Sequence, residues 1–198
     1  MAGNNTVIDV LRALDGEIEE VTQEEIVSLL EDGYRIVNCP ICGNKTMDCY
    51  AICCHCGWEY DIFIDYDDDN EFSDCNGTSL GEYKNVYRIL WDAYEKRKNG
   101  KLGKFYVITC YPSEFSWSIV SDSQATYGAF DSIEACHKAL NENRYDMHKR
   151  TYDLAVVDCI DTESNINEIG CFLWSEEKQG FFETDKKADW SSGWVKLV

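Results

Sequence analysis

The sequence has few prolines and no long apolar segment. Only Pro40 and Pro112 occur among 198 residues, which leaves little room for rigid linkers or proline-rich ligand segments. No stretch approaches the roughly 18 apolar residues that a membrane helix needs. The N-terminus, Met-Ala-Gly-Asn-Asn-Thr, lacks the basic region and apolar core of a secretory signal. The sequence therefore predicts neither a signal peptide nor a membrane span.

The chain also has few of the groups on which catalysis most often depends. It contains three histidines, and His137, beside Cys136, lies about 100° away from it on a helix, so the two do not by themselves form a catalytic pair. There is no Walker loop, dinucleotide-binding glycine pattern, nucleophile elbow or His-Glu-x-x-His segment. The sequence therefore does not favour an enzyme, although enzymes without such motifs exist.

Basic residues are scarce: 18 stand against 37 acidic ones, for a formal net charge of −19. The first 100 residues hold 21 acids and 8 bases, a net charge of −13, and the remainder hold 16 and 10, a net charge of −6. The electrostatic field of such a negatively charged protein repels nucleic acid and attracts basic surfaces. Direct DNA or RNA binding is thus disfavoured. The alternative is that the acidity only confers solubility or reflects an unusual host.

Cysteine, by contrast, is abundant. Eleven cysteines without a secretory signal indicate a reducing compartment, in which thiols stay free or bind metal, so the sequence predicts a cytoplasmic protein. A hydrophobic content of 44% with 13% aromatics is typical of a globular chain.

Two Cys-x-x-Cys-Gly turns stand close together, a first cysteine turn at residues 39–43 and a second at residues 53–57. Each offers two thiolates to one metal, and the glycine lets the backbone curl so that its N–H groups point at sulfur. Four soft ligands at this spacing favour one structural, tetrahedral Zn²⁺ with no open position. The alternatives are a disulfide pair or reduced core cysteines. The predicted ligands are Cys39, Cys42, Cys53 and Cys56.

Two further donors lie inside the second cysteine turn. Cys54 could replace Cys53 only with altered turn geometry. His55 occupies a position that usually points outward in such turns, and four thiolates already complete the tetrahedron. The predicted zinc ligands are therefore the four cysteines alone.

An acidic loop follows at residues 65–74. An EF-hand starting at Asp65 would need Gly at its sixth position and Glu at its twelfth, where the chain has Asn70 and Asn76. The sequence therefore predicts a solvated acidic loop. Two alternatives remain open: adventitious calcium or magnesium binding, and service as a surface for a basic partner. The predicted partner-binding residues are Asp65, Asp67, Asp68, Asp69, Glu71 and Asp74.

Hydrophobic periodicity and capping patterns predict an α+β protein with two domains. Residues 1–100 would form a helical lead-in and a zinc-ribbon or knuckle module flanked by helices. Residues 101–198 would form a mostly antiparallel sheet with one main helix. The expected helices cover residues 6–15, 23–32, 79–100 and 132–143. The expected strands cover residues 34–38, 46–52, 58–64, 105–111, 115–119, 125–130, 154–160, 170–174, 180–184 and 194–198.

The order of motifs in residues 33–95 resembles the cysteine-rich CPCC family of small bacterial and phage-associated domains. The shared elements are Cys39-Pro40-Ile41-Cys42-Gly43, Ile52-Cys53-Cys54-His55-Cys56-Gly57-Trp58-Glu59 and Asn76-Gly77-Thr78-Ser79-Leu80. The chain departs from the family at Ile41, where the family name implies cysteine, and at Cys54, where proline is usual. The resemblance implies zinc binding and carries no settled activity.

Three functions remain after these exclusions. The favoured one is a non-enzymatic acidic protein that docks on a basic, nucleic-acid-binding protein and inhibits it, as anti-CRISPR and anti-restriction DNA mimics do. It requires the acids to lie on one continuous face at phosphate-like spacing. The second is a protein-interaction or immunity-type adaptor that uses aromatics around Trp190 and Trp194, with binding that depends little on salt. The third is an unrecognised enzyme with a concave polar pocket.

Overall fold

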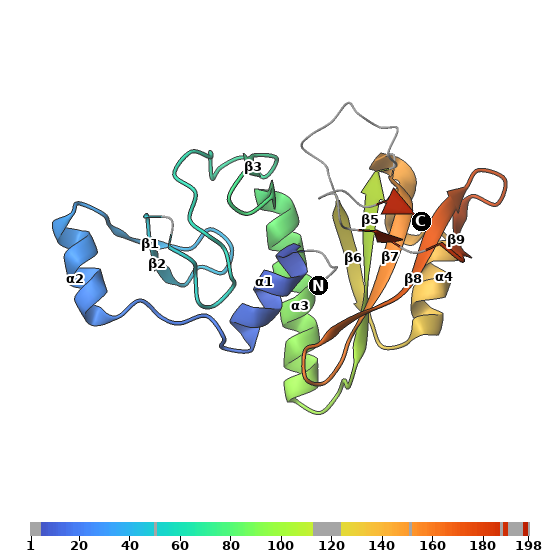
Figure 1. Cartoon of the computed structure of the whole chain (residues 1–198), viewed down its shortest axis with the longest axis horizontal. Helices are drawn as coiled ribbons and strands as arrows, with labels where there is room; N and C mark the ends of the chain where they lie inside the picture. The colour runs from blue at the N-terminus through green and yellow to red at the C-terminus, as the bar shows by residue number, and fades with distance from the viewer. Residues whose placement is uncertain are drawn as a thin grey trace. The chain divides into compact units, whose positions relative to one another are not determined.

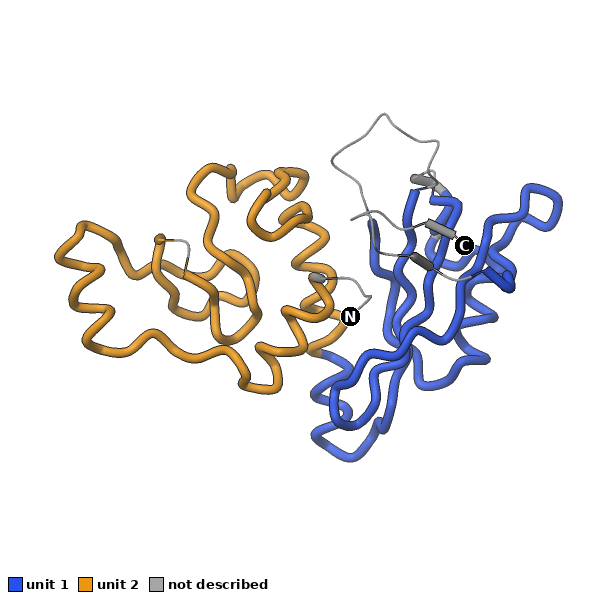
Figure 2. The backbone as a smooth tube through the Cα atoms, viewed as in Figure 1, with its two compact units in different colours: residues 1–4, 92–198 blue, residues 5–91 orange. Residues whose placement is uncertain are grey.

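A computed structural model describes residues 5–49, 51–112, 124–150, 152–186, 188–189 and 196–197 (Figure 1). The chain divides into an N-terminal unit, residues 5–91, and a C-terminal unit, residues 92–198 with residues 1–4 (Figure 2). This division falls inside helix α3 (Leu80–Lys98), whereas the sequence placed the boundary after residue 100. The fold is α+β, as predicted. Within the described part of the chain, no helix is long and apolar enough to cross a membrane.

The N-terminal unit combines helices with two short antiparallel strand pairs, β1 with β2 and β3 with β4. Its elements are α1 (Asn5–Leu14), α2 (Gln23–Glu31), β1 (Ile36–Asn38), β2 (Lys45–Met47), β3 (Phe72–Ser73), β4 (Thr78–Ser79) and the greater part of α3.

Among the described residues of the predicted strands at 46–52 and 58–64, pairing beyond Met47 is limited to an isolated bridge between Ile52 and Glu59, so these two predictions are wrong there. Side chains take the place of a strand partner. The Asn76 amide bonds both backbone groups of Glu59, and the Tyr66 hydroxyl bonds the N–H and C=O of the residue at position 61. Because these hydrogen bonds satisfy the backbone N–H and C=O groups of both residues, the segment does not require further strand pairing.

Helix α2 begins where the sequence predicts. The N–H of Glu25 donates to Thr22 Oγ1 at 3.2 Å and the N–H of Thr22 donates to Glu25 Oε2 at 2.8 Å, which completes a capping box. No residue of α2 is buried, however, and Val27 and Leu30 are exposed. A nine-residue helix is marginal on local interactions alone, so α2 depends strongly on this cap.

The long helix α3 buries most of the face that its apolar periodicity predicts. Leu80, Tyr83, Val86 and Leu90 are buried, Tyr87 and Tyr94 are half-buried, and Trp91, at 42% exposure, is the exception. Its basic last turn complements the negative end of the helix dipole. Arg97 in that turn also donates to the carbonyl of Asp161 and to Ser164 Oγ, both at 3.0 Å. These bonds lie within the C-terminal unit, to which residues 92–98 of α3 belong.

The C-terminal unit is built on an antiparallel sheet of strand order β6-β5-β7-β8-β9. The predicted strand at 115–119 and most of 194–198 lie outside the described residues. The elements of this unit are β5 (Phe105–Pro112), β6 (Ala125–Phe130), α4 (Ile133–Asn141), η1 (Arg144–Arg150), β7 (Tyr152–Ile160), β8 (Ile166–Ser175), β9 (Gly180–Thr184), β10 (Ala188–Asp189) and β11 (Lys196–Leu197).

The main core lies where α4 and η1 cover one face of this sheet, with Leu140 and Met147 packed on Ile108 and Phe172. Cys136, on α4, belongs to the same core, and burial together with Asp131 raises its thiol pKa to about 12. Cys110, Cys159 and Cys171 are also buried. All four lie in apolar strands or in a helix, where a cysteine packs as a small hydrophobic side chain.

One carboxylate is buried in the sheet. Asp158 on β7 is 4% exposed and faces Glu168 across the β7–β8 pair. Burial, and then repulsion from Glu168, raises the pKa of Asp158 to about 7.

Candidate metal centre

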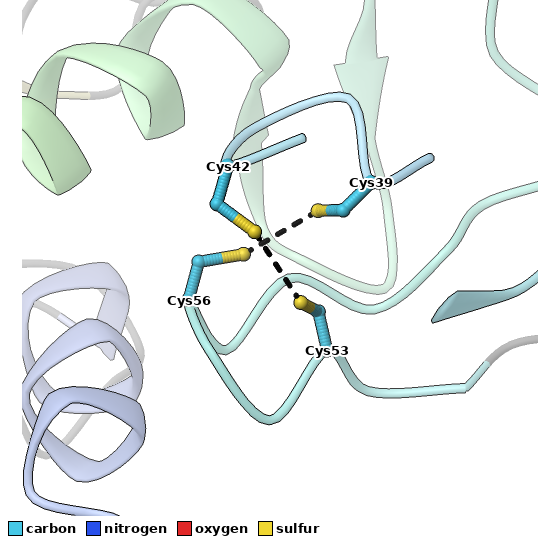
Figure 3. A group of neighbouring side chains, drawn as sticks. All are labelled: Cys39, Cys42, Cys53 and Cys56. Carbon is cyan, nitrogen blue, oxygen red and sulfur yellow. Dashed lines mark hydrogen bonds between the residues drawn. The ribbon is translucent and has the colours of Figure 1, made fainter. Parts of the chain in front are cut away.

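Four cysteine side chains converge in the N-terminal unit (Figure 3). The Sγ atoms of Cys39 and Cys56 lie 3.5 Å apart, those of Cys42 and Cys53 lie 3.6 Å apart, and all four sulfurs are within 4.8 Å of one another. Zinc–sulfur bonds of about 2.3 Å in a tetrahedron separate the sulfurs by roughly 3.8 Å. The four predicted ligands therefore form a group of the right size to hold a metal ion.

The first cysteine turn links β1 to β2. The N–H of Cys39 donates to the carbonyl of Asn44 at 2.7 Å and the N–H of Gly43 donates to the carbonyl of Cys39 at 2.9 Å, which closes the turn. Gly43 has φ +75° with open space around it. Asn44 donates to Cys42 Sγ through two groups, its backbone N–H and its side-chain amide. The distance from Asn44 Nδ2 to Cys42 Sγ is 3.4 Å. The turn therefore presents donors to a thiolate, as metal-binding turns do.

The second cysteine turn is held by two helices. Gly57 has φ +81°, and a Cβ there would lie 2.5 Å from the carbonyl oxygen of Asp9 on α1 and 2.9 Å from the Tyr83 hydroxyl on α3. That hydroxyl donates to the carbonyl of Cys56 at 3.1 Å. The buried ring of Trp58 packs edge-on against Tyr83, with centroids 4.9 Å apart. The turn is thus part of the helical core of its unit.

The thiols of the cluster interact strongly with one another. The pKa of Cys42 lies far below its ordinary value because Cys39, Cys53 and Cys56 donate hydrogen bonds to its thiolate. The pKa values of Cys53 and Cys56 are raised because their thiols are held as donors to Cys39 and Cys42. Four thiolates this close need a cation between them, and a divalent ion supplies that charge. The donor set therefore fits a metal.

Cys54 and His55 take no part in this cluster. Their ligand atoms instead lie within 4.8 Å of a carboxylate oxygen of Glu20 and of each other. Glu20 was not among the residues predicted from the sequence, since it precedes the second cysteine turn by more than 30 positions in an acidic segment of no distinctive spacing. Only the fold brings it there.

The acidic loop is exposed and ordered by its own hydrogen bonds. Carboxylate oxygens of Asp65 and Asp68 accept the N–H groups of Asp67 and Asn70, each at 2.9 Å. Asp69 forms an ion pair with Lys84 on α3, at 2.7 Å. Glu71 is half-buried, whereas the other predicted partner-binding residues, Asp65, Asp67, Asp68, Asp69 and Asp74, are exposed.

The ends of the acidic loop are anchored to the rest of the N-terminal unit. The buried carboxylate of Asp61 accepts hydrogen bonds from Ser73 Oγ at 2.8 Å and the N–H of Phe63 at 3.0 Å. The N–H of Gly81, at the start of α3, donates to the carbonyl of Asp69 at 2.8 Å. Two groups of metal-binding side chains occur among the described residues, and neither includes a residue of the acidic loop. The loop is a supported charged surface.

Comparison with protein-family models, with curated proteins and with solved structures found no match to this chain.

Proposed function

We propose that this protein is a zinc-stabilised inhibitor that docks its acidic loop on a basic, nucleic-acid-binding protein. The observation that carries the proposal is the acidic loop itself, which presents five exposed aspartates on a backbone held by hydrogen bonds within the loop and by an ion pair with α3. Four thiolates select Zn²⁺ among common divalent ions and leave it no site for a substrate. The metal would stabilise the fold, and the surface would bind the partner.

The charge of the N-terminal unit supports a basic partner. Residues 5–91 contain 19 acidic and five basic side chains, a net charge of −14. Four thiolates add four negative charges and a zinc ion adds two positive charges, so the zinc-bound unit is more negative by two charges. Such a field speeds the encounter with a cationic surface and makes binding sensitive to salt.

The ordering of the loop supports binding as well. A charged segment that is disordered loses conformational entropy when it docks, whereas one held by its own hydrogen bonds loses less. The contacts of Asp65, Asp68 and Asp69 fix the loop before any partner arrives. Residues 33–95 would then be a CPCC-type domain whose knuckles hold this surface. The eleven cysteines all lie in the part of the chain that the structure describes and form no disulfide there, which fits the reducing cytoplasm.

A second candidate function, a protein-interaction adaptor, is favoured by one observation. Phe63 is 83% exposed and Ile62 is 51% exposed, immediately before the acidic loop. Exposed neighbouring apolar side chains of this kind often mark a protein contact. Trp190 and Trp194, which the sequence pointed to for this function, lie outside the described residues. An adaptor would bind mainly through Phe63, and its binding would change little with salt.

A pull-down from lysate of the source cells with three baits separates these functions. The first bait is the wild type, and the second carries Asp65→Asn, Asp67→Asn and Asp68→Asn, because asparagine keeps the oxygen that accepts the loop's N–H groups. The third carries Glu163→Gln, Glu177→Gln and Asp185→Asn, which remove equal charge from exposed positions of the C-terminal unit.

The proposal predicts that a basic nucleic-acid-binding protein is captured by the first and third baits, elutes in high salt and is lost from the second. A neutral partner that all three baits retain in high salt, and that Phe63→Ser releases, would contradict the proposal and establish the adaptor.

A further inference from the structure

A second cluster of metal-binding side chains lies outside the four-cysteine group. The carboxylate of Glu20, the thiol of Cys54 and the imidazole of His55 place one ligand atom each within 4.8 Å of one another. Glu20 belongs to the segment between α1 and α2, while Cys54 and His55 are the two central residues of the second cysteine turn. The convergence of three different donor groups from two segments is a result of the fold.

The turn itself explains how one short segment supplies donors to both groups. Hydrogen bonds from the N–H groups of Cys56 and Gly57 to the carbonyl of Cys53, at 3.2 and 2.8 Å, fix a tight turn. Its outer residues, Cys53 and Cys56, place their sulfurs in the four-cysteine group (Figure 3), while its two central residues belong to the group that includes Glu20. The same turn therefore supplies donors to two separate groups.

We propose that Glu20, Cys54 and His55 form a second metal site, which takes a zinc-class divalent transition metal and leaves one coordination position open. Mixed sulfur, nitrogen and oxygen donors suit Zn²⁺ and Co²⁺, whereas Mg²⁺ and Ca²⁺ require oxygen ligands. Three protein ligands with a fourth position for water or another donor is the ligand count of open zinc sites. The four-cysteine group, by contrast, is closed.

The geometry allows this site to close around an ion. Ligand atoms of a tetrahedral zinc lie roughly 3.3–3.8 Å apart, so a movement of about 1 Å brings the three donors into range. Glu20 and His55 are exposed and Cys54 is half-buried, which gives their side chains that freedom.

The surroundings favour a cation. Glu19 and Glu25 line a hollow beside α2 together with Glu20. An ion bound by one thiolate and one carboxylate reduces this concentration of negative charge. A small positive ion is thus the ligand that this part of the surface is suited to attract.

Metal titration of the full-length protein tests the site. The chain is first loaded with one equivalent of Zn²⁺ and then titrated with Co²⁺, whose visible absorption reports thiolate ligation. We expect a second equivalent per chain, weakened about 100-fold or more by Cys54→Ser, His55→Ala or Glu20→Gln, since even the loss of supporting groups around a metal costs 10–100-fold. Cys75→Ser and Glu24→Gln, which alter exposed residues elsewhere, should leave it unchanged.

The outcomes are distinct. No second equivalent in the zinc-loaded wild type, or one that none of the three variants weakens, overturns the proposal. Glu20→Gln lies outside the cysteine turn, so its effect on Co²⁺ cannot come from damage to the first site; retention of one Zn²⁺ by that variant verifies this. The inference rests on the folded second cysteine turn and is independent of the identity of any protein partner.

Discussion

Two glycines in equivalent positions of the two cysteine turns offer a matched test of how the metal centre is supported. Both Gly43 and Gly57 have positive φ, +75° and +81°. A Cβ on Gly43 would have nothing within 4 Å of it, whereas a Cβ on Gly57 would lie 2.5 Å from the carbonyl oxygen of Asp9. The variants Gly43→Ala and Gly57→Ala therefore share the backbone penalty and differ in the packing penalty.

The magnitudes follow from these distances. An alanine in the left-handed region costs about 1–2 kcal/mol, which applies to both variants. At Gly57 the new methyl group is also at least 0.5 Å inside the 3.0 Å limit that Cβ atoms respect, and its neighbour is backbone that cannot rotate away. Forcing a methyl group into such a contact costs about 1–3 kcal/mol more. Gly57→Ala should thus destabilise the N-terminal unit by roughly 2–5 kcal/mol and Gly43→Ala by only about 1–2.

Urea unfolding of the zinc-loaded variants, followed by near-ultraviolet circular dichroism, measures the difference. The midpoint for the N-terminal unit should fall much further for Gly57→Ala, and the zinc content of Gly43→Ala should match the wild type. Equal destabilisation by the two substitutions would refute the reasoning, because it would mean that α1 and α3 do not close on the second turn.

Three further predictions concern the metal, the buried carboxylate and the exposed aromatic. Cys39→Ser should lose a large part of the roughly 10–16 kcal/mol that a structural zinc contributes to folding, so the N-terminal unit of this variant should melt first. The control variant Cys75→Ser should melt like the wild type. Equal melting temperatures for the two variants would contradict a metal at the cluster. Because the native pKa of Asp158 is raised from 3.8 to about 7, the folded chain holds a proton that the unfolded chain has released, and stability should fall as pH rises from about 4 to 7. Asp158→Asn should remove this fall and add up to roughly 4 kcal/mol at pH 8 in thermal unfolding, whereas Asp185→Asn should not. Phe63→Ser should leave stability unchanged, because Phe63 is exposed, and a lowered melting temperature would show an unrecognised packing role.

The sequence predicted the elements that follow strong local rules. The Cys-x-x-Cys-Gly spacing gave the four members of the cluster, and the Thr22–Glu25 capping pattern gave the start of α2. The apolar periodicity of α3 gave its buried face except for Trp91, which is exposed. In each case the residues that carry the signal are neighbours along the chain. Their geometry is therefore set by local backbone structure.

Features that depend on distant residues were not predictable in the same way. Nothing in the spacing of Glu20 connects it with Cys54 and His55. Gly81 weakens the helical pattern at the start of α3, yet its N–H holds the carbonyl of Asp69 at 2.8 Å, and a Cβ there would lie 2.9 Å from that oxygen. The first half of β8 was missed because most of residues 166–170 are exposed and give no alternating signal. Each of these depends on tertiary contacts.

Displacement of nucleic acid tests the central claim most directly. The basic protein captured by this chain is bound to a labelled nucleic-acid ligand, and the wild type or the Asp65→Asn, Asp67→Asn, Asp68→Asn variant is titrated in at increasing salt. If the acidic loop docks on the nucleic-acid-binding surface, the wild type displaces the ligand, the variant does so at least tenfold less well, and the difference shrinks as salt rises. Equal displacement by both, or capture without displacement, would contradict the account.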